Sequence, residues 1–118
     1  MKESILKNKS YDFALLIIET YKHISSNKKE FTLTRQLLKS GTSIGANIRE
    51  AEFAQSKKDF INKMSIALKE ASETEYWLLL LKDSDYLDLK IFNKLIDLNK
   101  ELIKMLVSTI NTMKSKLD

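Results

Sequence analysis

The chain contains no proline and only two glycines, Gly41 and Gly45, which lie four residues apart in the stretch SGTSIGANIREAE. Proline and glycine are the residues that most often interrupt regular structure, so their near absence favours long, continuous helices. Glycine nevertheless costs a helix interior about 1 kcal/mol relative to alanine. A chain that places both of its glycines inside one predicted helix therefore needs a packing reason for them.

Apolar residues recur with a 3.6-residue period in four segments, and no stretch alternates convincingly like a β-strand. The segments cover about residues 10–26 (or start earlier), 32–54, 57 to the stretch KDSD at 82–85, and 88–116. Ser56 and Asp59 have the spacing of a capping box, which predicts a helix beginning directly after Ser56. Helices joined by such short connections pack antiparallel. The sequence therefore predicts an all-α, up-and-down, left-handed four-helix bundle that forms a single domain over residues 1–118.

Both glycines map to the centre of the apolar face of the second helix when each residue advances by 100°. Large aliphatic residues flank them, namely Leu37, Ile44 and Ile48. The glycines therefore form a shallow notch, into which a neighbouring helix or one of its bulky side chains can pack closely. A flexible hinge is the alternative, although the flanking residues keep the helical period.

The opposite face of this helix is also built from small residues, whereas a solvated face normally carries longer charged ones. We expect this face to meet a second partner, and the simplest partner is another copy of the chain. The apolar run Trp77–Leu81 also indicates a second partner, because it covers more than one face of its helix. A wide core with a few exposed leucines is the alternative. Glu50 is expected to be partly buried and paired. The candidate helix-packing and oligomer-contact residues are Ser40, Gly41, Ser43, Gly45, Asn47, Glu50 and Trp77.

The segment from Arg35 to Leu87 resembles the four-helix-bundle 23S rRNA intervening sequence proteins, also called S23 proteins, above all in SGTSIGANIREA and IALKEASETEYWL. FALLI upstream and NKELIKMLVSTINTMK downstream extend the resemblance over nearly the whole chain. The resemblance implies a left-handed four-helix bundle that assembles as a homopentamer with a central channel. It also implies kinship with the accessory variability determinant proteins of diversity-generating retroelements. Those proteins are basic pentamers that bind nucleic acid and a reverse transcriptase, whereas this chain is less basic and has only two arginines.

The residues offer little catalytic chemistry. The absence of cysteine removes disulfides, thiolate nucleophiles and zinc–cysteine sites. His23 is the only histidine, so the two Glu-x-x-His pairs of a di-iron bundle cannot form, and we expect it at the surface or a helix end. The glycines lie inside a helix rather than before one, so they form no phosphate-binding loop. Glu70, Glu73 and Glu75 are expected to form ion pairs within the bundle or across subunits. The sequence thus predicts no enzyme, metal or cofactor.

The formal net charge of +4 and the pI near 9.2 permit contact with nucleic acid without requiring it. The candidate nucleic-acid residues surround the turn between the second and third helices and continue along the second: Arg35, Lys39, Arg49, Lys57, Lys58 and Lys63. A second basic stripe follows the last helix through Lys90, Lys94 and Lys104, and is interrupted by Asp97 and Glu101. Several copies around one axis would add their phosphate contacts. A solvated surface of mixed charge is the alternative for both.

The all-apolar runs are short, with six residues in Phe13–Ile18 and five in Trp77–Leu81, far below the ~20 that cross a membrane. The start of the chain also lacks the apolar core of a signal peptide, so we expect a cytoplasmic protein without membrane contact. The sequence predicts a non-enzymatic homo-oligomer, a pentameric scaffold associated with RNA or DNA and with a reverse transcriptase or another protein. A protein–protein adaptor that does not bind nucleic acid is the alternative.

Overall fold

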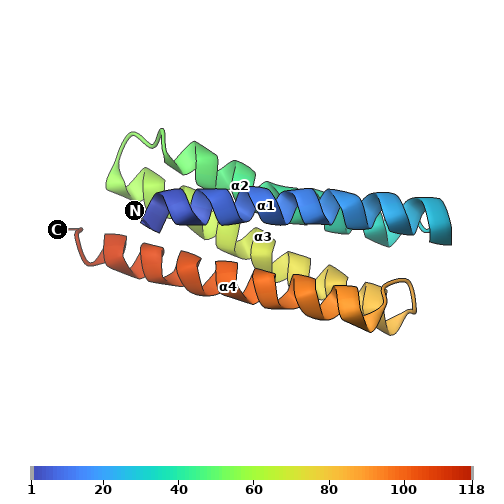
Figure 1. Cartoon of the computed structure of the whole chain (residues 1–118). Helices are drawn as coiled ribbons and strands as arrows, with labels where there is room; N and C mark the ends of the chain where they lie inside the picture. The colour runs from blue at the N-terminus through green and yellow to red at the C-terminus, as the bar shows by residue number, and fades with distance from the viewer. Residues whose placement is uncertain (1, 118) are drawn as a thin grey trace.

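The computed structural model describes the backbone of residues 2–117 and the side chains of residues 5–117. Over these residues the chain forms four α-helices and no strand. The helices are α1 (Lys2–His23), α2 (Thr32–Ala51), α3 (Lys57–Asp83) and α4 (Leu89–Lys114), with a π-helical segment, η1 (Ile24–Lys28), after α1. Consecutive helices run in opposite directions along a rod of 51 × 21 × 20 Å (Figure 1). The predicted all-α, up-and-down four-helix bundle is confirmed.

Each helix packs mainly against two neighbours, so that α1 contacts α2 and α4, and α3 contacts α2 and α4. The apolar stripes of all four helices meet along the axis of the rod. The largest fully buried side chains there are Leu6, Phe13, Ile17, Ile24, Leu37, Ile44, Ile48, Met64, Leu78, Leu81, Leu95 and Leu102. Both ends of the chain and the α2–α3 turn lie at the same end of the rod (Figure 1). None of the helices in the described part is long and apolar enough to cross a membrane.

Side-chain caps fix three of the helix starts. The backbone N–H of Asp59 donates to Ser56 Oγ at 3.0 Å, which confirms the predicted start of α3. Asp88 caps α4 in the same way, accepting from the N–H of Ile91 at 2.9 Å. Glu30 precedes α2, and its carboxylate accepts from the N–H groups of residues 32, 33 and 34 at 2.8–3.1 Å. These acceptors satisfy N–H groups that have no partner within the helix.

Two helix boundaries lie away from the residues at which they were placed. α1 begins at Lys2, the earlier start that the sequence left open, because Leu6 is fully buried in the core and extends the stripe by two turns. α2 ends at Ala51 rather than Ala54, because residues 52–54 turn the chain toward α3. The end of η1 was also not predicted, since Lys29 takes the left-handed conformation (φ 57°) that glycine usually supplies.

The two glycines face α1. A Cβ atom on Gly41 would lie 2.8 Å from Cγ1 and 2.9 Å from Cγ2 of Ile17. A Cβ atom on Gly45 would lie 3.3 Å from Ser10 Oγ and 3.5 Å from the backbone of Ser10. α2 is helical through both positions, and neither glycine has a positive φ. The glycines therefore bring α1 close to α2 rather than bending the chain.

Candidate nucleic-acid interface

The structure brings together four of the six candidate nucleic-acid residues. Arg49 lies in the last turn of α2, Lys57 and Lys58 begin α3, and Lys63 follows in its second turn. All four lie at the end of the rod that carries the α2–α3 turn. Arg35 and Lys39 are exposed near the other end of α2, about 15–21 Å from Arg49 at 1.5 Å per residue. They therefore do not belong to the same cluster.

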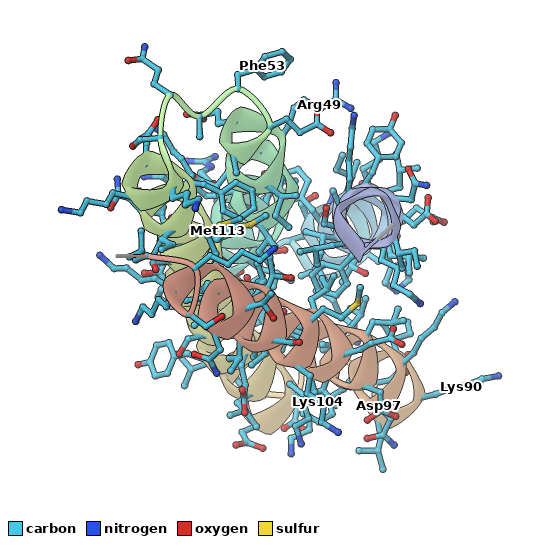
Figure 2. All side chains as sticks on the ribbon, turned by 90° about the vertical axis from the view of Figure 1, so that its left-hand side faces the viewer. Arg49, Phe53, Lys90, Asp97, Lys104 and Met113 are labelled. Atoms are coloured by element: carbon cyan, nitrogen blue, oxygen red, sulfur yellow. The ribbon has the colours of Figure 1, made fainter. Side chains whose placement is uncertain are left out.

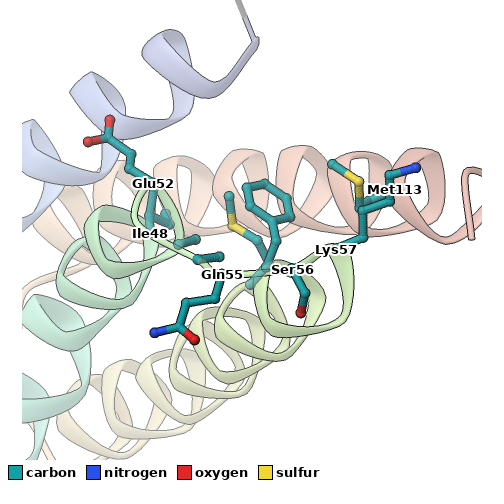
Figure 3. A pocket seen from close by; sticks show the side chains of 10 residues that line it. Ile48, Glu52, Gln55, Ser56, Lys57 and Met113 are labelled. Carbon is teal, nitrogen blue, oxygen red and sulfur yellow. The ribbon is translucent and has the colours of Figure 1, made fainter.

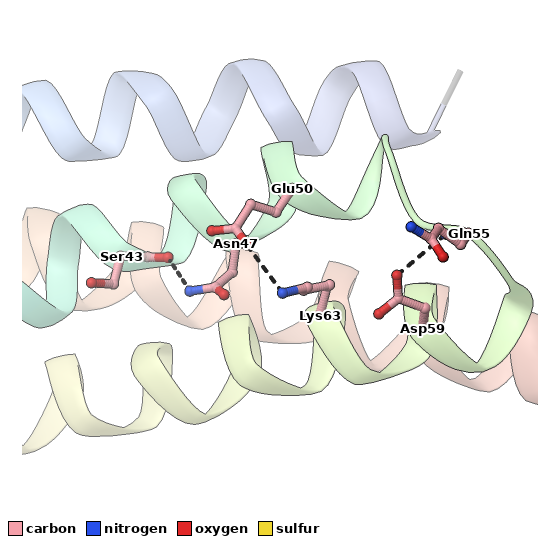
Figure 4. Close-up of polar contacts among 6 residues, drawn as sticks. All are labelled: Ser43, Asn47, Glu50, Gln55, Asp59 and Lys63. Carbon is pink, nitrogen blue, oxygen red and sulfur yellow. Dashed lines mark hydrogen bonds and ion pairs between the residues drawn. The ribbon is translucent and has the colours of Figure 1, made fainter.

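The acidic residues of this region have partners already. Glu50 pairs with Lys63 at 3.1 Å, and Glu52 pairs with Lys7 of α1 at 2.9 Å. Asp59 accepts from the backbone N–H of Gln55 at 3.2 Å (Figure 4). Among the residues that the structure describes, Arg49 and Lys58 consequently form no ion pair.

Three further basic residues, Lys7, Lys114 and Lys116, lie at this end and were not predicted. Lys57 Nζ donates to the backbone carbonyl of Lys116 at 3.1 Å, which joins the start of α3 to the segment after α4. The up-and-down topology itself could have indicated them, because the start of α1 and the end of α4 must share one end of the bundle. We call the whole set the basic end: Lys7, Arg49, Lys57, Lys58, Lys63, Lys114 and Lys116. Among the residues whose side chains the structure describes, these seven basic side chains share the end with three acidic ones, Glu50, Glu52 and Asp59.

A cleft of about 420 Å³ opens within the basic end, between α2, α3 and the last turn of α4 (Figure 3). Its apolar lining consists of Ile48, Ala51, Ala54, Phe60, Met64 and Met113. Its polar rim consists of Glu52, Gln55, Ser56 and Lys57. Phe53 lies on the turn beside the cleft with 79% of its surface exposed, and it points away from the bundle (Figure 2).

The second predicted stripe lies on the outer side of α4. Lys90, Asp97 and Lys104 are seven residues apart, so they share one side of the helix (Figure 2). Asp97 separates the two lysines, and Glu101 pairs with Lys9 of α1 at 3.2 Å. The stripe therefore alternates in charge along about 21 Å, and it offers phosphates a weaker site than the basic end.

The candidate oligomer residues of α2 occupy different environments. Ser40 is fully buried and accepts a hydrogen bond from Thr74 of α3 at 3.0 Å, so its small size fits a contact within the chain. Ser43 and Asn47 are half-buried, and the Asn47 amide donates to the Ser43 carbonyl at 2.8 Å (Figure 4). Glu50 forms the expected ion pair. The expectation that it is partly buried is wrong for the single chain, because its side chain is 58% exposed. The reason is that it points along the surface to Lys63.

Trp77 is half-buried on α3, and its ring meets Tyr76 edge-on with centroids 5.0 Å apart. Its indole N–H is buried and has no hydrogen-bond partner among the described residues. Leu79, two residues on, remains exposed, whereas Leu78 and Leu81 are buried in the core. The run Trp77–Leu81 thus leaves part of its apolar surface uncovered in the single chain.

The histidine and acidic candidates lie on different helices, α1 and α3. His23 ends α1, is exposed, and contacts the Asn27 amide at 2.8 Å, as expected of a helix-end residue. Within the described chain, Glu70, Glu73 and Glu75 make no ion pair, so of the two expected kinds of pairing only that across subunits stays a prediction. Burial, and secondarily the neighbouring Glu73, raise the pKa of Glu70 above 4.5. No group of three or more metal-ligating side chains occurs in the part of the chain described.

Comparison with known proteins gives a matching family and similar solved structures. Residues 2–108 match the 23S rRNA-intervening sequence protein family. The fold is similar to a crystal structure of a protein with unknown function from the S23 ribosomal protein family of Bacteroides thetaiotaomicron VPI-5482, with a TM-score of 0.93. The two sequences are 50% identical over 94% of this chain and 99% of the other. No curated protein matches the chain.

Proposed function

The chain belongs to the 23S rRNA-intervening sequence protein family, and we propose that it is a non-enzymatic, homo-oligomeric scaffold that binds nucleic acid through the basic end. One observation carries the proposal. The three acidic residues described at this end, Glu50, Glu52 and Asp59, are paired or cap a helix, while Arg49 and Lys58 face solvent without an acidic partner in the described chain.

The chemistry of the basic end suits the phosphate backbone rather than particular bases. Arginine and lysine side chains neutralise phosphates and release condensed counterions, so each contact adds to the affinity and to its salt dependence. The seven basic side chains come from all four helices, hence the bundle presents them together without a dedicated binding motif. Several copies in one assembly would multiply these contacts.

Uncovered apolar surface supports self-association, with a homopentamer as the proposed assembly. Tyr11 and Leu15 of α1 are 58% and 47% exposed. A groove of about 290 Å³ lies beside Tyr11, between α1 and α2, with Ala14 and Ala46 in its lining. Light scattering tests the assembly. A pentamer would have about five times the 13.7 kDa of one chain, and a monomer would refute it.

Fluorescence anisotropy with labelled RNA and DNA tests the binding. Arg49→Glu combined with Lys58→Glu should weaken binding strongly at low salt and reduce the slope of affinity against salt by about one per lost phosphate contact. Lys90→Glu combined with Lys104→Glu is the matched control, because it makes the same charge change on the stripe of α4 and should weaken binding less.

The runner-up function is a protein–protein adaptor, which the exposed apolar surface of α1 also favours. The two functions differ in one measurement. If the intact protein binds no nucleic acid at low salt, the scaffold function is wrong and the adaptor function remains. A reverse transcriptase or another protein is the partner proposed for either.

A further inference from the structure

We infer that the basic end binds single-stranded rather than double-stranded nucleic acid, with Phe53 as the platform on which an unpaired base stacks. The inference rests on the nucleic-acid function proposed above and names the class of strand that this site accepts. It comes from an aromatic ring whose position the sequence pattern did not reveal.

Phe53 is the most exposed of the large apolar side chains that the structure describes, at 79%. It lies in an ordered turn, since its own N–H donates to the Glu50 carbonyl and that of Ala54 donates to the Ala51 carbonyl, both at 3.1 Å. Arg49 precedes it by four residues, about one helical turn. A phenyl ring is thus held in solvent next to a cation that has no acidic partner in the described chain.

The positive charge of the basic end decides which kind of partner can cover the Phe53 ring. A second copy docking the same end would bring together two surfaces that each carry seven basic and three acidic side chains among the described residues, and the net like-charge repulsion disfavours this contact. An anionic partner is attracted instead. Duplex DNA and RNA hide the faces of their bases by stacking, whereas a single strand offers them to aromatic side chains. Nucleic acid with unpaired bases therefore fits both the charge and the exposed ring.

The cleft next to Phe53 offers a second apolar surface against which a base can pack. Glu52 and Ala54, on either side of Phe53, both line it, so a strand that stacks one base on the ring passes the mouth of the cleft. Met64 and Met113 form part of its lining, and methionine sulfur packs favourably against aromatic rings. Lys57, at the rim, can then contact the backbone of the strand.

The test compares a 15-nucleotide single strand with a 15-base-pair duplex in anisotropy titrations of the full chain. The single strand should bind more tightly than the duplex. Phe53→Ala should weaken binding of the single strand roughly 5- to 150-fold, the range that base–aromatic stacking predicts, and change duplex binding little. Phe31→Ala is the matched control, because Phe31 is 48% exposed at the opposite end of the rod and should not change binding.

A second variant separates stacking from an indirect effect on folding. Phe53→Trp should retain binding, and its extra fluorescence over the background of Trp77 should be quenched when the strand binds. Equal binding of strand and duplex, with no effect of Phe53→Ala but a clear effect of Arg49→Glu and Lys58→Glu, would overturn this inference and leave the proposed function intact. Loss of all nucleic-acid binding in the intact protein would overturn both.

Discussion

The contact between Gly41 and Ile17 gives the sharpest prediction about stability. Ile17 is fully buried, and its Cγ1 and Cγ2 atoms would lie 2.8 and 2.9 Å from a new Cβ on residue 41. Both atoms are bonded directly to the Ile17 Cβ, so they cannot move away without a new rotamer or a displacement of α1. Gly41→Ala therefore forces the two helices apart or strains the side chain.

The magnitude follows from two opposing effects. Alanine gains about 1 kcal/mol over glycine in a helix interior. Overpacking a well-filled core typically costs about 1–3 kcal/mol. We expect Gly41→Ala to lower the free energy of unfolding by about 1 kcal/mol. Gly45→Ala is the internal comparison, since its nearest contact would be 3.3 Å and involves Ser10 Oγ. There the helix propensity should prevail, and stability should rise by up to about 1 kcal/mol.

Variants of Ile17 identify the cause. Ile17→Ala removes both close atoms, so it should offset the effect of Gly41→Ala, making the double variant about 1–2 kcal/mol more stable than the sum of the two changes. Ile17→Val keeps Cγ1 and Cγ2 and should give no such rescue. Urea denaturation followed by circular dichroism measures each free energy. The reasoning is refuted if Gly41→Ala is as stable as the parent protein, or if Val rescues as well as Ala.

Three further changes test other features of the fold by the same denaturation measurements. Asp88→Ala removes the cap of α4 and should cost about 1 kcal/mol, while an unchanged stability would show that the cap is dispensable. Asn99→Leu removes a buried carbonyl oxygen that has no partner in the described chain, and should raise stability by about 1 kcal/mol. A loss of stability would show that the bond from the Asn99 amide to the Ala71 carbonyl outweighs this gain. Glu70→Gln should stabilise the protein at pH 7, and the gain should shrink as the pH falls through the raised pKa of Glu70, because the folded state binds that proton more readily than the unfolded state. A gain independent of pH would contradict this cause.

The sequence predicted the fold well where a local pattern determines it. Ser56 and Asp59 marked the start of α3 correctly, because a cap depends on residues three apart in the chain. The start of α1 could not be fixed beyond the statement that it lies near residue 10 or earlier, because one buried residue, Leu6, provides too little periodicity to extend a helix over residues 2–9. The end of η1 was missed for another reason. Lys29 has the left-handed conformation that glycine usually supplies, so the sequence has no glycine to mark this position.

The candidate site was predictable only in part. Arg49, Lys57 and Lys58 are close in sequence and lie at one end of the rod. Lys7 and Lys116 reach this end through contacts with residues far away in the chain: Lys7 pairs with Glu52, 45 residues later, and Lys116 accepts from Lys57, 59 residues earlier. Such contacts depend on how helices are aligned, which periodicity does not specify. The exposure of Phe53 was equally hidden, because an aromatic residue after an amphipathic helix is more often part of the core.

Both ends of the described chain lie at the end of the rod where the basic residues gather (Figure 1). A domain or enzyme joined to either end is consequently held next to whatever that surface binds, at an effective concentration set by the linker alone. Tethering of this kind needs no new contact between the two proteins. The same arrangement means that a fluorophore or affinity tag belongs in the α3–α4 connection, at the other end of the rod, where it cannot cover the basic end.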